Sequence, residues 1–190
     1  MESFRGREIE AMCRRCGAAT TATGIELEYL GCAYEISFPE VSFHPETISL
    51  AERILLLHYL TGMENQPTKD KYVSYKDLPN AMFYYAAFRN NGPASILRQF
   101  GSDPDRIVAA AESLGGSKTT FGDVSVELSI LPNISMAFVL HAGDSEFPPE
   151  AHILFKDNII NYLPLEDISI LAGIAARKLV QATKASRPGR

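Results

Sequence analysis

The sequence predicts an α+β fold, with a mostly antiparallel sheet and helices packed on it, in one domain that covers residues 1–190. Hydrophobic and polar residues alternate with a period of two in two separate parts of the chain, as they do in strands that bury one face. Segments with helical spacing and capping signals lie between and after them. With 190 residues and 46% hydrophobic content, the chain is long enough to bury one sizeable core.

The N-terminal part predicts a short helix followed by a hairpin. Residues 5–17 form a polar helical segment that Gly17 ends. In the segments 25–29 and 34–38, hydrophobic residues alternate with polar ones on either side of a turn at Gly31. We therefore expect a two-stranded hairpin with one buried and one exposed face.

A second helix is expected after Ser49. Ser49 and Glu52 have the spacing of a capping box, an apolar run covers residues 54–57, and Gly62 ends the segment. Because this helix is apolar on nearly all sides, we expect it to lie at the centre of the fold.

Two further helices are expected at residues 94–100 and 104–114, after a turn at residues 90–93. Asp103 is the expected N-cap of the second of these helices, because Pro104 follows it at a position that suits the first helical residue.

Three consecutive strands are expected in the C-terminal half. Residues 124–130 alternate cleanly, residues 134–141 are apolar enough to be covered on both faces, and residues 151–155 complete an antiparallel group. The last helix begins near Pro164 and is expected to pack by a single apolar stripe. The tail at residues 184–190 is expected to be frayed.

The composition argues against two classes of partner. The net charge is −5 and the Lys and Arg residues are scattered, so the basic surface that binds nucleic acid is not expected. The longest strongly apolar run, residues 134–140, is too short to cross a membrane. Three cysteines are an odd number and fit a reducing compartment, so we expect a cytoplasmic protein.

The cysteines themselves have two interpretations. Cys13, Cys16, Cys32 and His44 together supply three sulfurs and an imidazole, which is formally enough for a tetrahedral zinc site. However, zinc ligands usually come in two tight pairs on turns, whereas Cys13 and Cys16 fall in the expected first helix. The alternative is three small, partly buried thiols.

Five short segments follow one another in the order and spacing of a known family. They are LLLHYL at 55–60, VSYKDLP at 73–79, GDSEFP at 143–148, LF at 154–155 and YLPLED at 162–167. Through these segments the chain resembles the domain of unknown function 3786 family, over roughly residues 8–180. At His141, Ser145 and Lys156 the chain departs from the family pattern, which weakens the expectation of a fixed catalytic set.

The resemblance implies a setting rather than an activity. Family members occur mainly in anaerobic bacteria and archaea, and some are fused to a cysteine-rich iron–sulfur domain of the kind found on corrinoid proteins. The resemblance therefore implies an accessory or binding domain in anaerobic redox or corrinoid-linked one-carbon metabolism, with an iron–sulfur or corrinoid protein as partner. The sequence requires no cofactor, and a corrinoid or other tetrapyrrole is the class that the resemblance suggests.

The segment 141–152 is the first candidate site, because it joins two expected strands and holds two imidazoles and three carboxylates. Asp144 or Glu146 with His141 or His152 would suit a small acid–base or metal-dependent enzyme, which is the alternative function. The structural interpretation is equally concrete, because a Gly-Asp pair suits a tight turn and a glutamate can cap backbone N–H groups. The sequence leaves open whether the chain is an enzyme.

Candidates for binding a cofactor form a second group. They are His58 and Tyr59 near the end of the second helix, and Tyr84, Tyr85 and Arg89 in an aromatic-rich segment. The aromatic side chains would form a wall against a flat cofactor, and Arg89 would pair with a propionate or phosphate. Alternatively, the aromatic residues build the core, and the histidine is a favourable charge at a helix end.

Overall fold

The computed structural model describes residues 2–62 and 69–185, and the side chains at positions 8–62 and 69–183. The first element is helix α1 (Glu2–Cys16), which Gly17 follows in a turn. Gly17 has a φ of +68°, and a Cβ at this position would lie 2.6 Å from Cβ of Pro132. Only glycine therefore combines this backbone conformation with so close a contact.

An antiparallel sheet of four strands follows, in the spatial order β1–β2–β3–β4. Its strands are β1 (Ala19–Thr20), β2 (Gly24–Tyr29), β3 (Cys32–Ser37) and β4 (Ser42–His44). Strands β2 and β3 form the predicted hairpin, in which Ile25 lies opposite Ile36 and Leu27 opposite Tyr34. All four of these side chains are buried, so the predicted buried face is confirmed.

A second antiparallel sheet has five strands in the order β5–β9–β8–β7–β6. They are β5 (Tyr72–Ser74), β6 (Ser117–Thr119), β7 (Val124–Leu131), β8 (Ile134–His141) and β9 (Glu150–Lys156). The three strands expected in the C-terminal half are therefore present, and β8 is buried from Met136 to Leu140 as predicted. The backbone N–H of Leu30 donates to the carbonyl of Ile130 at 2.9 Å, which joins the two sheets.

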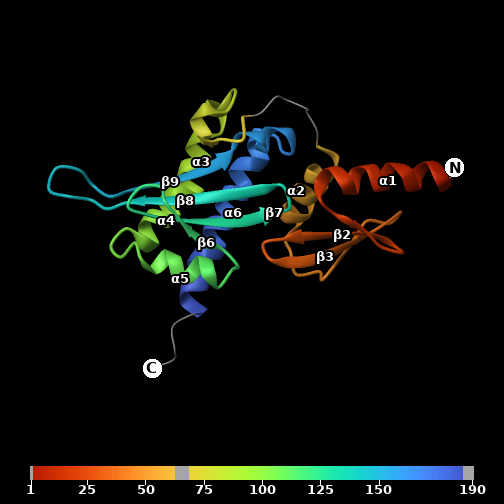
Figure 1. The fold of residues 1–190 in the computed structure, drawn as a ribbon, viewed down its shortest axis with the longest axis horizontal. Helices are drawn as coiled ribbons and strands as arrows, with labels where there is room; N and C mark the ends of the chain where they lie inside the picture. The colour runs from red at the N-terminus through yellow and green to blue at the C-terminus, as the bar shows by residue number, and fades with distance from the viewer. Residues whose placement is uncertain (1, 63–68, 186–190) are drawn as a thin grey trace.

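Among the helices that follow α1, the first packs against α1 and the others lie beside the five-stranded sheet (Figure 1). They are α2 (Leu50–Thr61), α3 (Tyr85–Asn91), α4 (Pro93–Phe100), α5 (Arg106–Glu112) and α6 (Leu165–Ala185), with 3₁₀ turns η1 (Tyr75–Asp77), η2 (Ala81–Phe83) and η3 (Asp157–Asn161). Helices α4 and α5 contact the sheet, and α6 contacts α3, α4 and α5. Two antiparallel sheets with packed helices confirm the predicted α+β class. No helix in the described part of the chain is long and apolar enough to cross a membrane.

Two expectations about the helices are wrong. The centre of the fold is α6 and not α2, because every residue of α6 from Leu171 to Ala176 is buried, whereas Leu50 and Ile54 of α2 are 73% and 44% exposed. The expected cap of α5 is also displaced, because the helix begins at Arg106 after Asp105, which makes no side-chain cap hydrogen bond. The capping box of Ser49 and Glu52 at α2 is confirmed.

The helix before the C-terminal tail extends slightly further than expected, into the segment 184–190. Helix α6 continues to Ala185, and residues 186–190 lie outside the described part of the chain. At the opposite side of the fold from α1, the connection between β8 and β9 projects away from the body of the molecule (Figure 1).

Candidate functional site

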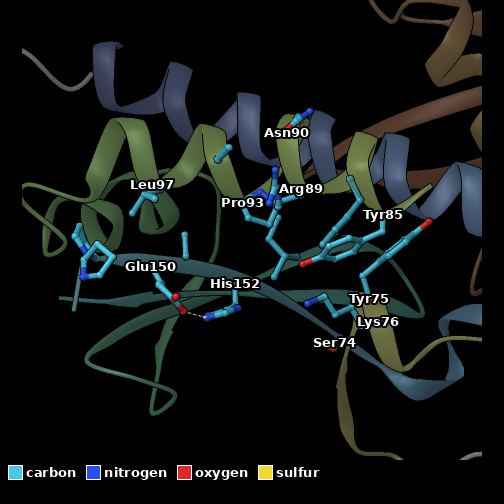
Figure 2. A pocket seen from close by; sticks show the side chains of 16 residues that line it. Ser74, Tyr75, Lys76, Tyr85, Arg89, Asn90, Pro93, Leu97, Glu150 and His152 are labelled. Atoms are coloured by element: carbon cyan, nitrogen blue, oxygen red, sulfur yellow. Dashed lines mark hydrogen bonds and ion pairs between the residues drawn. The ribbon is translucent and has the colours of Figure 1, made fainter. Parts of the chain in front are cut away.

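A cleft of about 780 Å³ lies between helices α3 and α4 and the outer part of β9 (Figure 2). Arg89, Pro93 and Leu97 reach it from the helices, and residues 148–153 form the facing wall. The cleft thus joins two candidate groups that lie some sixty residues apart in the sequence, the aromatic-rich segment and the segment 141–152. Its volume is in the range of sites that bind small ligands.

The aromatic end of the cleft is rigid. The ring of Tyr75 stacks on Phe88 with centroids 4.3 Å apart and planes at 11°, and the edge of Phe155 packs against it. The Tyr75 hydroxyl donates a hydrogen bond to the carbonyl of Leu165 at 2.8 Å. Burial raises the pKa of Tyr75 to about 12, so the hydroxyl stays protonated and keeps this bond at neutral pH.

Positive charge dominates the polar groups of the cleft. Lys76 and Arg89 line it, and Glu150 is the one carboxylate among the described lining residues. Nζ of Lys76 lies 4.7 Å from the ring centroid of Tyr85, a cation–π contact. Glu150 is engaged by His152, whose Nε2 lies 3.2 Å from its carboxylate. Within the described part of the chain, neither Lys76 nor Arg89 forms an ion pair.

The projecting loop uses one of its candidate carboxylates for its own structure. Oδ1 of Asp144 accepts hydrogen bonds from the backbone N–H groups of Glu146 and Phe147, both at 2.8 Å. These bonds lower the pKa of Asp144. The N–H of Asp144 in turn donates to the carbonyl of Phe147 at 2.9 Å, which closes the turn. Glu146 is exposed and, like Asp144, does not line the cleft.

The two histidines of this segment do meet. The rings of His141 and His152 are 5.5 Å apart between centroids, in an edge-to-face arrangement. His152 lines the cleft, whereas His141 does not. The structure therefore brings His141, His152 and Glu150 together at one end of β8 and β9, with Asp144 engaged elsewhere in the loop. Among the described residues, no group of three His, Cys, Asp or Glu side chains is arranged to hold a metal ion.

The remaining cofactor candidates are dispersed. Tyr59 is fully buried, and its hydroxyl donates to the carbonyl of Cys16 at 2.8 Å, which is a core position. His58 pairs with Asp167 away from the cleft, and the Tyr84 hydroxyl lies 3.4 Å from a carboxylate oxygen of Glu166. Of the five residues named in the sequence, only Tyr85 and Arg89 line the cleft.

The cysteines do not converge. Cys13 and Cys16 are buried in α1, and Sγ of Cys16 donates to the carbonyl of Tyr59 at 3.4 Å, whereas Cys32 is exposed on the hairpin. Burial raises the pKa of both Cys13 and Cys16, which keeps them as thiols. The structure thus places Cys13 and Cys16 as buried thiols and leaves Cys32 exposed, so the thiol interpretation describes two of the three side chains.

Two side chains were not among the candidate site residues: Lys76, which lines the cleft, and Asp167, which pairs with His58. Lys76 lies within the motif VSYKDLP and Asp167 within YLPLED, so both were inside family segments without being singled out. Lys76 lies two residues after β5, which carries Tyr72 and Val73, and a basic residue shortly after an aromatic strand was the available signal. No local pattern relates it to Arg89, because the two are joined only through tertiary packing.

The fold and the cleft define an α+β protein with a basic, aromatic-walled groove beside its larger sheet. A family model described as domain of unknown function (DUF3786) matches residues 8–178. The chain belongs to this family, and the resemblance found in the sequence is confirmed. Neither a curated protein nor a solved structure shows significant similarity to the chain.

Proposed function

We propose that this chain is a non-catalytic accessory domain whose cleft binds an anionic ligand, either a cofactor or a segment of a partner protein. The observation that carries the proposal is the presence of Lys76 and Arg89 on one aromatic-walled cleft, with no ion pair to either within the described residues. The chain as a whole carries a net charge of −5, so this local excess of positive charge runs against its composition. An anion between the two side chains would gain charge-assisted hydrogen bonds.

The setting that we propose is the cytoplasm of an anaerobe, in redox or corrinoid-linked one-carbon metabolism. This part of the proposal rests on the family resemblance. A corrinoid, a haem with its propionates and a flavin with its phosphate each combine a flat apolar surface with polar or anionic substituents. The cleft offers part of such a surface, since the half-buried ring of Tyr85 lines it together with Arg89, above the buried stack of Tyr75 and Phe88. An iron–sulfur or corrinoid protein is the partner that we propose.

The test is a binding experiment with protein purified without oxygen. Hydroxocobalamin, haemin, flavin mononucleotide and an acidic peptide are titrated, with absorbance, anisotropy and melting temperature as readouts. We expect at least one probe to bind and raise the melting temperature, and Arg89→Ala and Lys76→Ala to weaken that binding about tenfold. Arg98→Ala is the matched control, because Arg98 is exposed on α4 and does not line the cleft. The proposal is wrong if no probe binds, or if binding does not depend on Arg89.

A small acid–base or metal-dependent enzyme is the second candidate. The observation in its favour is the contact between His141 and His152, with Glu150 beside His152. The described residues do not preform a metal site here, so a metal-dependent enzyme requires that Co²⁺ draw these side chains together, which a d–d absorption spectrum that is lost in His152→Ala would report. If Asp144 and Glu146 are catalytic, their replacement by Asn and Gln should abolish an activity while the melting temperature stays unchanged.

A further inference from the structure

We propose that the cleft receives an extended acidic segment of a partner protein, which pairs as an added strand with the free outer edge of β9 at Ala151. This inference rests on the proposed function and names the class of its ligand. It depends on three features of the described residues: an unpaired strand edge, the direction of two backbone groups, and the charge beside them.

The outer edge of β9 is only partly covered. On one side, β8 pairs with β9 from Glu150 to Phe155. On the other side, β5 pairs only with residues 154–156, and the chain leaves the sheet at Tyr75 as the turn η1. Between Glu150 and Ile153, therefore, this edge has no neighbouring strand within the described part of the chain.

The register of β5 and β9 gives the direction of the backbone groups on that edge. The N–H of Asp157 donates to the carbonyl of Lys71 at 2.9 Å, so this is a hydrogen-bonded pair. Hydrogen-bonded pairs recur at every second residue of an antiparallel ladder, so Phe155, Ile153 and Ala151 all direct N–H and C=O groups toward the same edge. Phe155 has Val73 opposite it, whereas Ala151 lies beyond the end of β5. Its two backbone groups thus point outward where the cleft lies.

The cleft runs along the strand rather than across it (Figure 2). Glu150 and His152 mark the strand side, Arg89, Pro93 and Leu97 the helix side, and Tyr75 and Tyr85 one end. The edge from residue 150 to residue 153 is about 10 Å long at the rise of a β-strand, which suits an extended segment of about four residues. Pro149 ends the edge because proline has no N–H to offer.

The positive charge of the cleft favours a partner segment that is acidic. Lys76 and Arg89 lie on the cleft without a described ion pair, and the carboxylate of Glu150 already interacts with His152. A glutamate or aspartate side chain of the added strand would meet one of the two cations. Strand addition of this kind obtains affinity from main-chain hydrogen bonds and specificity from the flanking side chains.

A flat cofactor would fit this edge less well than a peptide. A ring seated against β9 would cover the N–H and C=O of Ala151 without pairing them, at a cost of several-fold to more than a hundredfold in affinity for each unsatisfied group. An added strand pairs both groups. The backbone of β9 therefore favours a peptide over a ring at this edge.

The experiment measures fluorescence anisotropy of labelled hexapeptides with the full chain. The first peptide alternates valine and glutamate, the second alternates valine and lysine, and two more are valine-glutamate peptides that are N-methylated at every valine or at every glutamate. We expect the first peptide to bind and the lysine peptide to bind at least tenfold more weakly. At least one N-methylated peptide should lose about tenfold in affinity, because a strand pairs through one edge only.

Two protein variants isolate the edge. Ala151→Pro removes a single N–H that points outward and leaves the bonds between β9 and β8 intact, since those belong to Glu150 and His152. We expect about tenfold weaker binding of the first peptide. Ala151→Ser keeps the N–H and is the matched control. If Ala151→Pro proves misfolded by circular dichroism, the N-methylated peptides decide on their own.

Two results overturn the inference. One is the absence of binding by the first peptide up to about 1 mM; the other is equal binding of all the N-methylated forms. If a cofactor then binds with dependence on Arg89, the proposed function stands and only strand pairing is rejected. If no probe depends on Arg89, both proposals are wrong.

Discussion

Nδ1 of His58 lies 2.6 Å from Oδ2 of Asp167, and this contact joins the last turn of α2 to the first turn of α6. The His58 side chain is 49% exposed and that of Asp167 only 10%. The imidazole therefore covers a carboxylate that is almost out of contact with water. Because neither residue lines the cleft, the pair acts on the fold rather than on the candidate site.

Removal of His58 should destabilise the protein. In His58→Ala the nearly buried carboxylate of Asp167 loses its partner, and we expect the free energy of unfolding to fall by about 1–3 kcal/mol. The double variant with Asp167→Ala should lose less than the sum of the single variants, because both changes remove the same interaction. Urea unfolding measures these values. A change in His58→Ala within about 0.5 kcal/mol would show that solvent replaces the imidazole.

Tyr59 should contribute to stability and not to ligand binding. Its buried hydroxyl donates to the carbonyl of Cys16 at 2.8 Å and accepts from the N–H of Asn133 at 3.2 Å. Tyr59→Phe leaves both of these backbone groups without their partner, so we expect a loss of about 1–3 kcal/mol in unfolding free energy. Binding of the cleft probes should not change. A selective loss of binding at unchanged stability would restore the cofactor role considered from the sequence.

Local patterns predicted the hairpin and the three C-terminal strands correctly, but they missed the short strands β1, β4, β5 and β6 and failed on which helix is central. The alternation of Ile25 to Phe38 depends on neighbours in sequence, as does the capping box at Ser49. The central position of α6, by contrast, does not depend on neighbours in sequence. Its middle is rich in small residues, Ala172, Gly173, Ala175 and Ala176 among them, which add little to an apolar pattern but allow other elements to approach closely.

The candidate site was predicted in its parts and not in its assembly. The aromatic segment and the segment 141–152 were both identified, but the cleft between them exists because β5 pairs with β9 across some eighty residues of sequence. The same pairing creates the free edge at Ala151, since β5 ends after three residues. For Asp144 the sequence was misleading in the other direction. Its spacing to nearby imidazoles suggested acid–base or metal chemistry, but its carboxylate accepts hydrogen bonds from backbone N–H groups of its own turn.

The three cysteines should differ in reactivity. Cys32 is exposed, whereas Cys13 and Cys16 are buried and burial raises the pKa of both thiols. Because the thiolate is the nucleophile, native protein treated briefly with iodoacetamide at neutral pH should gain one adduct, located at Cys32 by peptide mass spectrometry. Unfolding in urea should raise the number to three. Modification of Cys13 or Cys16 in the native state would contradict the burial of α1 against α2.

The loop between β8 and β9 should lose order in acid. Hydrogen bonds from Glu146 and Phe147 lower the pKa of Asp144, so the ionised carboxylate is the form that holds the turn. This contribution is present above the ordinary pKa of an aspartate and is lost as pH falls through the lowered value of the folded state. The protection of the amides at positions 146 and 147, measured relative to their intrinsic exchange rates, should fall over that range, and Asp144→Ala should show the low protection already at neutral pH. Protection in Asp144→Ala equal to that of the parent would assign the turn to other contacts.

Gly173 in α6 should tolerate a side chain poorly, and its substitution should reach the cleft. A Cβ at Gly173 would lie 3.1 Å from Cβ of Asn91, the last residue of α3, beside the corner where Pro93 begins α4. A helix normally gains up to about 1 kcal/mol when glycine is replaced by alanine. The methyl groups of Gly173→Val oppose that gain, because they must push α3 away, and overpacking costs about 1–3 kcal/mol.

We therefore expect Gly173→Val to lower the free energy of unfolding in urea and to weaken the binding of the cleft probes together. Ile170→Val is the matched control, since Ile170 is on the same helix but 39% exposed and should change stability by less than about 0.5 kcal/mol. If Gly173→Val is as stable as the parent, the contact between α3 and α6 has more room for a side chain than the 3.1 Å separation indicates. If the variant is destabilised but binds normally, the helix wall of the cleft moves independently of α6. Only the combined loss supports a cleft whose width is set by the packing of α3 on the central helix.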